Sequence, residues 1–260
     1  DIRCKPGRCF GLIDMAATKG GKSMIQTEKL KLLLEEQGIF ADAAQLDQFN
    51  RYAEMLLEWN EKINLTAITD PDEILLKHFL DSALLLRYFP FPNKAAFLDV
   101  GTGAGFPSVP CTILRPDLKL TLLDSLNKRV VFLSELCKEL GITAKCLHMR
   151  AEEGGKLASL REQFDIVTAR AVAHLRELSE YCLPFVKKDG VFIALKGPDV
   201  RTELSEAQKA IGILGGKVER VVEYKLGDVG DRTLILIRKI SHTSTKYPRN
   251  TAKIKKQPLN

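Results

Sequence analysis

The stretch Phe97–Pro110, FLDVGTGAGFPSVP, decides the fold of this chain. Its apolar beginning predicts a buried β-strand at 96–100, and Gly101, Gly103 and Gly105 predict a tight turn directly after that strand. Glycines allow a positive φ angle and let a ligand come close to the backbone. A glycine-rich turn after a buried strand therefore indicates a site for a small ligand, and the residues around the turn have to show which ligand fits.

Downstream of the turn, short apolar segments alternate with helical patterns. Strands are expected at 96–100, 119–124, 144–149, 164–169, 190–196, 217–224 and 232–239, and helices at 107–115, 126–140, 154–162, 175–187 and 200–214. This alternation is typical of an α/β fold, in which helices cover both faces of a parallel sheet. Only Gly227–Gly230 separates the last two strands, which is too short for a crossover helix. We therefore predict a seven-stranded, mostly parallel sheet whose last strand is antiparallel.

Upstream of the turn, residues 24–92 show helical patterns and no strand pattern. Apolar residues at helical spacing mark one helix at 43–63. Asp70 and Pro71 provide an N-cap and a first helical residue for another helix, which should run to about Phe89. The expected division of the chain is an unstructured leader or N-terminal extension at 1–23, a helical cap at 24–92, an α/β domain at 93–240 and a basic tail at 241–260.

The composition restricts the class of protein. The chain has 260 residues, of which 45% are hydrophobic, and this suits one large α/β domain with a small addition. The longest apolar run is far below the ~20 residues that a membrane span needs. The cysteines lack a Cys-x-x-Cys pair and the histidines lack ligand spacing, so we expect no metal site. We interpret the cysteines from Cys111 onward as buried, reduced thiols, and we expect a cytoplasmic monomer that does not bind membranes.

The net charge of +6 is unevenly distributed along the chain. Residues 238–260 contain seven basic and no acidic side chains, whereas 24–237 contain more acidic than basic ones. A basic tail beside an acidic body favours a polyanionic partner. A solvated, frayed terminus is the alternative at this point.

The glycine spacing argues against two common phosphate-binding loops. A dinucleotide fingerprint has the pattern G-x-G-x-x-G, but here Phe106 occupies the third glycine position and Pro107 removes an N–H at the helix start. No Gly-Lys-Ser/Thr follows, which excludes a P-loop. Asp124 ends the second expected strand, where a carboxylate can accept both hydroxyls of a ribose. Together these features favour a nucleoside without phosphates, as in S-adenosylmethionine; a structural turn with a surface aspartate is the alternative.

Several ordered motifs resemble one known family. They are DVGTGAGFP at 99–107, LLDSLNKR at 122–129, RAEE at 150–153, ARA at 169–171 and ALKG at 194–197, together with Asn64-Leu65-Thr66, His78-x-x-Asp81-Ser82 and Lys246-Tyr-Pro-Arg249. With these motifs the chain is similar to the RsmG family, also called GidB, over about residues 25–258. The resemblance implies a class I, Rossmann-like methyltransferase fold with a helical N-terminal extension. It also implies methylation of N7 of one guanine in the decoding-region loop of 16S ribosomal RNA, with S-adenosyl-L-methionine as the methyl donor.

The resemblance further implies the residues of the site. Those expected to bind the cofactor are Gly101, Gly103 and Phe106 of the glycine turn, Asp124, Ser125 and Leu126 after the second strand, Ala151 and Glu152 after the third, and Arg170 after the fourth. Glu152 would face the adenine amino group, although the backbone N–H of Ala151 serves that edge equally well. Each of these residues lies where an expected strand ends, which agrees with the rule that ligands bind at the carboxyl edge of such sheets.

The chemistry of this reaction requires no general base, because guanine N7 carries an exposed lone pair and no proton. We therefore expect catalysis by positioning and desolvation, with Arg170 and Lys196 as positioning candidates and no certain catalytic residue. Arginine and lysine can hold guanine O6 or a phosphate. The expected RNA contacts are Arg150, Arg170, Lys196 and Arg232 near the pocket, and Lys246, Arg249, Lys253, Lys255 and Lys256 in the tail.

Three polar residues of the cap, Asn64, His78 and Asp81, have no role fixed by their motifs. We expect His78 to be a buried histidine with satisfied hydrogen bonds, and Asn64 to cap a helix or to hold the cap against the sheet. Either of the two could instead reach the substrate loop.

Three other functions are weighed against the RNA methyltransferase. A dinucleotide-dependent oxidoreductase suits the fold but not the glycine spacing. A non-catalytic RNA-binding module would require a vestigial cofactor pocket. A small-molecule methyltransferase would leave the basic tail unexplained.

Overall fold

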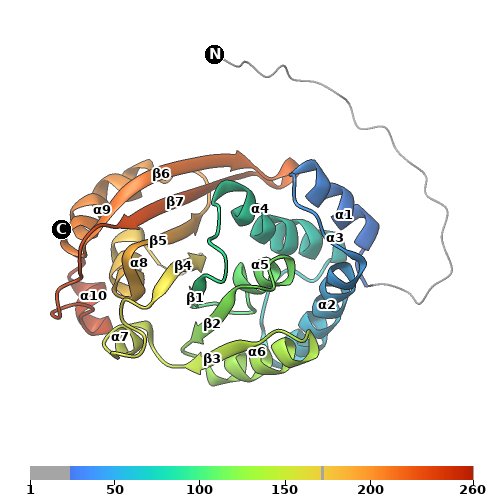
Figure 1. Ribbon diagram of the computed structural model, residues 1–260, viewed down its shortest axis with the longest axis horizontal. Coiled ribbons are helices and arrows are strands. Elements are labelled where there is room, and N and C mark those ends of the chain that lie inside the picture. Colours follow the sequence, from blue (N-terminus) through green and yellow to red (C-terminus); the bar gives the residue numbers. More distant parts are fainter. Residues whose placement is uncertain (1–23, 171–172, 260) are drawn as a thin grey trace, which may run out of the picture.

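The computed structural model describes residues 24–170 and 173–259 of the chain, so the leader predicted at 1–23 lies outside the described residues (Figure 1). The helix predicted at 43–63 is confirmed, as is the helix predicted after Asp70, whose side chain accepts the Glu73 N–H at 3.0 Å. The cap consists of α1 (Thr27–Glu36), α2 (Ala43–Ile63) and a continuous helical run made of α3 (Pro71–Glu73), the π-helical η1 (Ile74–Leu80) and α4 (Asp81–Tyr88).

A seven-stranded sheet with the order β3-β2-β1-β4-β5-β7-β6 forms the centre of the molecule. Its strands are β1 (Ala96–Val100), β2 (Lys119–Asp124), β3 (Ala144–His148), β4 (Phe164–Arg170), β5 (Val186–Lys196), β6 (Gly216–Lys225) and β7 (Asp231–Lys239). All pairs from β3 through β5 are parallel, and β7 is antiparallel to both β5 and β6. The predicted fold class is confirmed, including the antiparallel last strand.

Helices cover both faces of the sheet (Figure 1). On β5, Val191 and Ile193 belong to one hydrophobic core, whereas Phe192 and Ala194 belong to the other, because successive side chains of a strand point to opposite faces. The first core is covered by α5 (Ser108–Leu114), α6 (Asn127–Glu139) and the cap, and the second by α8 (Leu175–Cys182), α9 (Arg201–Ile213) and α10 (Thr251–Lys256). The cap thus shares one continuous core with the sheet.

The helix predicted at 154–162 is wrong in its position. The structure has α7 (Ala151–Gly154) instead, which begins earlier and ends at a pair of glycines, Gly154 and Gly155. Glycine is the poorest helix former after proline, so two in succession favour the end of a helix. The shift places Ala151 and Glu152 in the first turn of a helix.

The helix predicted at 175–187 is too long. It ends as α8 at Cys182 and continues as the short 3₁₀ helix η2 (Leu183–Phe185), which contains Pro184. Proline has no N–H for the helical ladder, and its ring clashes with the preceding turn. β5 consequently starts at Val186, four positions before the predicted strand.

The C-terminal residues fold back onto the α8 side of the sheet and end in α10. Ile254 of α10 is fully buried in the second core. The alternative of a solvated, frayed terminus is therefore wrong.

Cys111, Cys137 and Cys182 are buried free thiols, and Cys146 is a half-buried one, so the expected burial is confirmed for all but Cys146. Cys4 and Cys9 lie outside the described residues. Within 24–170 and 173–259, no three His, Cys, Asp or Glu side chains are grouped as metal ligands would be. The same part of the chain has no helix with the length and apolar character of a membrane span.

Candidate cofactor site

The glycine turn connects β1 to α5 at the carboxyl edge of the sheet. Gly101, Gly103 and Gly105 have φ angles of 66°, 62° and 99°, which other residues rarely adopt. The Gly101 N–H donates to the Leu123 carbonyl of β2 at 2.8 Å. A Cβ atom at Gly105 would lie 2.7 Å from the Tyr52 hydroxyl, so glycine at this position also lets cap helix α2 approach the turn.

The carboxylate of Asp124, the last residue of β2, joins two loops of this edge. Its Oδ2 accepts the Gly103 N–H at 3.0 Å and its Oδ1 accepts the Leu126 N–H at 2.9 Å. The side chain is buried, and the Arg129 guanidinium lies 3.6 Å from Oδ2. A carboxylate has about four lone-pair positions. Asp124 therefore keeps acceptor capacity for the hydroxyl groups of a ligand.

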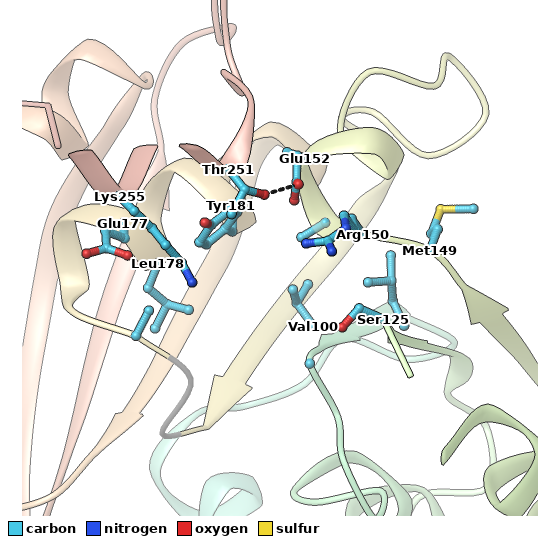
Figure 2. A pocket seen from close by; sticks show the side chains of 14 residues that line it. Val100, Ser125, Met149, Arg150, Glu152, Glu177, Leu178, Tyr181, Thr251 and Lys255 are labelled. Atoms are coloured by element: carbon cyan, nitrogen blue, oxygen red, sulfur yellow. Dashed lines mark hydrogen bonds between the residues drawn. The ribbon is translucent and has the colours of Figure 1, made fainter. Parts of the chain in front are cut away.

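A cavity opens beside the turn, between the ends of β1, β2 and β3 and the helices α7, α8 and α10 (Figure 2). Four predicted cofactor residues, Gly101, Ser125, Ala151 and Glu152, line it together although they come from three different loops. Arg150, predicted as an RNA contact, lines the same cavity. The other lining residues are Val100, Leu123, Met149, Ala173, Glu177, Leu178, Tyr181, Thr251 and Lys255.

The chemistry of the lining fits an adenosine group that carries an amino-acid chain. Met149, Leu178 and Tyr181 offer apolar and aromatic surface for a purine. The lining also carries two carboxylates, Glu152 and Glu177, and two cations, Arg150 and Lys255. The carboxylates attract the ammonium and sulfonium cations of S-adenosylmethionine, and the cations attract its carboxylate. The residues present therefore fit S-adenosylmethionine, which the backbone of the glycine turn, Asp124 and Glu152 would hold.

Five predicted cofactor residues do not line this cavity: Gly103, Phe106, Asp124, Leu126 and Arg170. The ring of Phe106 is buried and stacks on the rings of Tyr52 and His78, with centroid distances of 5.2 Å and 4.3 Å. The Arg170 guanidinium lies over the same ring at 5.0 Å. Leu126 contributes its N–H to Asp124, and its side chain is exposed. The side chains of Phe106 and Arg170 thus pack against the cap, and their contact with the cofactor stays a prediction.

His78 is a buried member of this stack, and both of its ring nitrogens have partners. Nε2 lies 2.9 Å from Thr66 Oγ1, and Nδ1 lies 3.5 Å from the Arg170 guanidinium. Burial, followed by the positive charge of Arg170, lowers the pKa of His78 to about 3. The ring is therefore neutral at pH 7, and the expectation of a satisfied, buried histidine is confirmed. Asn64 is the C-cap of α2, as one of its two predicted roles required.

Asp81 connects the cap to three strands of the sheet, β4, β6 and β7. Its Oδ1 accepts the Tyr224 hydroxyl of β6 at 2.9 Å and lies 3.7 Å from Arg232 Nε, while Oδ2 lies 3.9 Å from Arg170. Burial raises the pKa of Asp81 above its ordinary value, although the two arginines and Tyr224 oppose that shift. This carboxylate thus holds two of the predicted functional arginines near one point.

Lys196 and Arg232 lie near a second cavity, which Arg232 lines and Lys196 does not. Lys196 Nζ donates to the Ala173 carbonyl at 2.6 Å and pairs with Glu203 at 2.5 Å, which leaves its side chain 10% exposed. Thr233 lies opposite Lys196 in the β5–β7 register. Lys196 itself lines neither cavity, but its hydrogen-bond partner Ala173 lines the first and its register partner Thr233 lines the second. The second cavity, of about 510 Å³, is lined by Pro198, Asp199, Arg201, Glu223, Tyr224, Lys225, Asp231, Arg232 and Thr233.

The basic residues of the tail differ in their surroundings. Arg249 forms an ion pair with the buried Glu180 at 2.7 Å and is 14% exposed, so this structure shows it in a contact within the protein, and its contact with RNA stays a prediction. Lys255 lines the first cavity. Lys246, Lys253 and Lys256 are exposed.

Comparison with known proteins decides the family. The model of the GidB family, described as rRNA small subunit methyltransferase G, matches residues 45–235. The chain belongs to the GidB family. A relative from Geobacillus sp. (strain WCH70), named Ribosomal RNA small subunit methyltransferase G, is 48% identical over 237 residues, 90% of this chain and 100% of that protein. A relative of the same name from Lactobacillus johnsonii is 50% identical over 230 residues, 87% of this chain and 96% of that protein.

The fold of this GidB chain is that of Rossmann-like methyltransferases. Among solved structures, the mitomycin 7-O-methyltransferase MmcR matches with a TM-score of 0.50 and 17% identity, covering 75% of this chain and 70% of that one. At this identity the likeness concerns the fold alone.

The GidB motifs located only part of the cavity. The residues after β1, β2 and β3 were found because a motif marks each strand end. Glu177, Leu178 and Tyr181 of α8 were missed, because an apolar helix face indicates core packing as readily as a pocket wall. Thr251 and Lys255 were missed because no local pattern shows where a tail returns to.

Proposed function

We propose that this GidB-family chain transfers a methyl group from S-adenosylmethionine to N7 of a guanine in the decoding-region loop of 16S ribosomal RNA. The observation that carries the proposal is the cavity after β1, β2 and β3, which Gly101 of the glycine turn and Glu152 line without a phosphate-binding loop. Asp124 lies between the lining residues Leu123 and Ser125 in the sequence, and its carboxylate accepts the Gly103 N–H of the turn. The name of the relatives, Ribosomal RNA small subunit methyltransferase G, supports the substrate. The protein would act in the cytoplasm on the small subunit or its RNA.

The chain would contribute positioning rather than proton transfer. Bound S-adenosylmethionine supplies an activated methyl group, and guanine N7 is already nucleophilic, so no residue has to remove a proton. Holding two reactants in a fixed orientation can lower the activation free energy by about 7–11 kcal/mol. Asp124 accepts the Gly103 N–H of the turn, and Lys196 donates to the Ala173 carbonyl before α8. Lys196 is therefore proposed as a positioning residue.

The second cavity is the proposed entry for the acceptor nucleotide, because its lining residue Thr233 pairs with Lys196 in the β5–β7 register and Lys196 contacts Ala173 of the cofactor cavity. Arg232 lines it and can hold guanine O6 or a phosphate, whereas a donor bound to N7 itself would block the reaction. Arg150 is exposed at the rim of the cofactor cavity and is proposed as a phosphate contact. Lys246 is a further exposed candidate.

A transfer assay tests this function. Small ribosomal subunits from cells without the modification are incubated with the protein and methyl-labelled S-adenosylmethionine, and the labelled nucleotide is mapped by strand cleavage at 7-methylguanosine. We expect label at one guanine of the decoding-region loop. Label at an adenine, at a ring position other than N7, or only on small molecules would contradict the proposal. Binding of NAD in place of S-adenosylmethionine would favour the oxidoreductase instead.

A further inference from the structure

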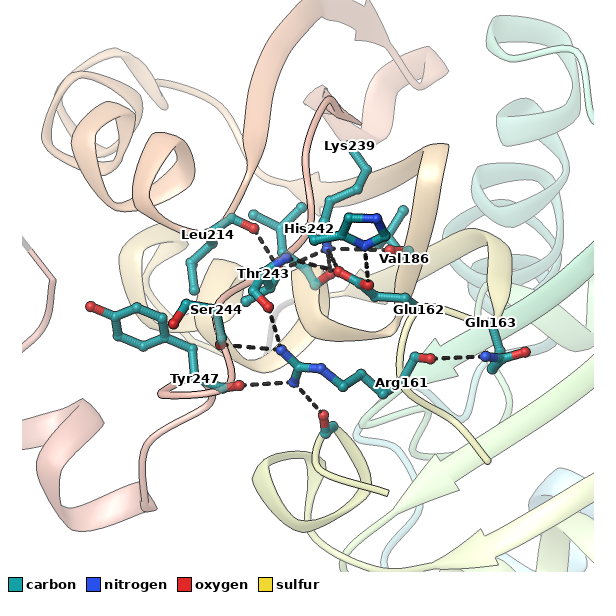
Figure 3. A network of polar contacts seen from close by, with 12 residues as sticks. Arg161, Glu162, Gln163, Val186, Leu214, Lys239, His242, Thr243, Ser244 and Tyr247 are labelled. Atoms are coloured by element: carbon teal, nitrogen blue, oxygen red, sulfur yellow. Dashed lines mark hydrogen bonds and ion pairs between the residues drawn. The ribbon is translucent and has the colours of Figure 1, made fainter. Parts of the chain in front are cut away.

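The C-terminal segment, defined here as residues 241–259, follows a path that one arginine fixes (Figure 3). The Arg161 guanidinium donates to the carbonyls of Thr243, Ser244 and Tyr247 at 2.6, 3.1 and 2.8 Å. It also donates to the Gly155 carbonyl directly after α7, at 2.8 Å. The segment is thereby tied to the helix that carries Glu152.

A buried ion pair anchors the beginning of the same segment (Figure 3). The Lys239 ammonium is fully buried, 3.1 Å from a Glu162 carboxylate oxygen, and it donates to Thr243 Oγ1 at 2.7 Å. Glu162 also accepts the Thr243 N–H at 2.8 Å. A buried charge is costly unless it is paired in this way, so these contacts favour one position of the chain.

A second ion pair holds the segment against α8. Arg249 donates from its backbone N–H and its Nε to Glu180 Oε1 at 2.8 and 2.9 Å, and from its terminal nitrogen to Oε2 at 2.7 Å. Glu180 is 1% exposed. Bidentate arginine–carboxylate pairs are among the stronger ion pairs in proteins. If Arg249 moved away to bind RNA, the buried Glu180 carboxylate would lose its partner, which is costly.

Beyond Arg249, helix α10 forms one side of the cofactor cavity (Figure 2). Thr251 donates its hydroxyl to Glu152 Oε1, and Lys255 reaches over Leu178 into the lining. Ile254 between them is fully buried. The cavity measures about 210 Å³ with these side chains in place, less than the roughly 300–1,000 Å³ of typical ligand pockets.

We propose that residues 246–257 are a wall of the cofactor site, held by the Arg249–Glu180 pair, with Thr251 as a positioning residue for Glu152. The segment then serves cofactor binding through its buried side and not as a free arm along RNA. This inference rests on the proposed function, because the ligand is S-adenosylmethionine. The three lysines of α10 are all exposed, but only Lys255 also lines the cavity, so it is assigned differently from Lys253 and Lys256.

Calorimetric titration with S-adenosylmethionine, without RNA, tests the proposal on the full chain. Thr251→Val removes the hydroxyl and keeps the shape, and Ile254→Ala loosens the docking of α10. We expect Thr251→Val to raise the Kd about tenfold, because Glu152 loses a hydrogen bond that its carboxylate accepts. Lys253→Ala and Lys256→Ala are control variants on the same helix: each removes an exposed positive charge and no contact of the docked side, and they should leave the Kd within about twofold. An unfolding curve for each variant shows that it is folded.

Hydrogen exchange of the unaltered protein gives a second readout that needs no variant. S-adenosylmethionine should slow amide exchange in Thr251–Lys256. If the protein binds S-adenosylmethionine, but exchange in α10 and the Kd of Thr251→Val are unchanged, the proposal is overturned and the function stands. If the unaltered protein does not bind S-adenosylmethionine, the proposed function fails, and this inference fails with it. A Kd raised equally by the lysine controls would also overturn the proposal, because charge and not docking would then matter.

Discussion

Gly105→Ala should destabilise the protein much more than Gly103→Ala, although both glycines lie in one turn. At Gly105 the added Cβ would lie 2.7 Å from the Tyr52 hydroxyl and 2.8 Å from Val109 Cγ2. At Gly103 it would meet no atom within 4 Å. Both positions have positive φ angles, so alanine carries a backbone cost of roughly 1–2 kcal/mol at each. Crowding at Gly105 adds about 1–3 kcal/mol, since Tyr52 and Val109 are themselves buried.

The expected loss in the free energy of unfolding is therefore about 2–5 kcal/mol for Gly105→Ala and about 1–2 kcal/mol for Gly103→Ala. Denaturant unfolding of both variants measures it. Tyr52→Phe supplies a matched background, because it removes the hydroxyl that the new Cβ would meet. Gly105→Ala should cost less in that background than in the unaltered protein, by about 0.5–3 kcal/mol. Equal losses for the two glycine variants, or no relief in the Tyr52→Phe background, would refute the packing described here.

Three further predictions concern the residues around the cap. Because the pKa of His78 is about 3 in the folded protein, against ~6.5 for a free histidine, only the unfolded chain takes up this proton as the pH falls from 7 to 4. Over that range the advantage of the unaltered protein over His78→Gln should shrink by about 3 kcal/mol in denaturant unfolding, and parallel pH profiles would contradict this. Tyr224→Phe loses the hydrogen bond to buried Asp81 and should lower the free energy of unfolding by about 1–3 kcal/mol, while its ring neighbour Tyr88→Phe should change little. Arg232→Gln should raise the KM for small subunits several-fold and leave the Kd for S-adenosylmethionine unchanged; the opposite pattern would move Arg232 into the cofactor site.

Local sequence patterns were sufficient for the order and type of most elements. The period of 3.6 at 43–63, the Asp70-Pro71 start signal and the short link at Gly227–Gly230 each have a direct physical cause, and each gave the correct element. Positions at the ends of strands could also be predicted, because parallel strands bring their carboxyl ends to one edge. Gly101, Ser125, Ala151 and Glu152 meet at the cavity for that reason.

Local sequence patterns do not predict contacts between residues that are far apart in the sequence. A phenylalanine in a ligand turn can face the ligand or the neighbouring domain, and only packing against Tyr52 and His78 settles the position of Phe106. Net charge predicted a polyanionic partner for the tail, but it could not show that Arg249 pairs with a buried carboxylate, Glu180, which is far away in the sequence and has no motif of its own.

The central claim is that the carboxyl edge of β1 and β2 binds S-adenosylmethionine through the carboxylate of Asp124. Calorimetric titration of the purified protein and of Asp124→Asn with this compound tests the claim most directly, because the amide keeps the shape but loses charge and acceptor positions. The account predicts binding by the unaltered protein and at least roughly tenfold weaker binding by the variant. No binding by the unaltered protein at millimolar concentrations, or equal affinity of the two proteins, would contradict it.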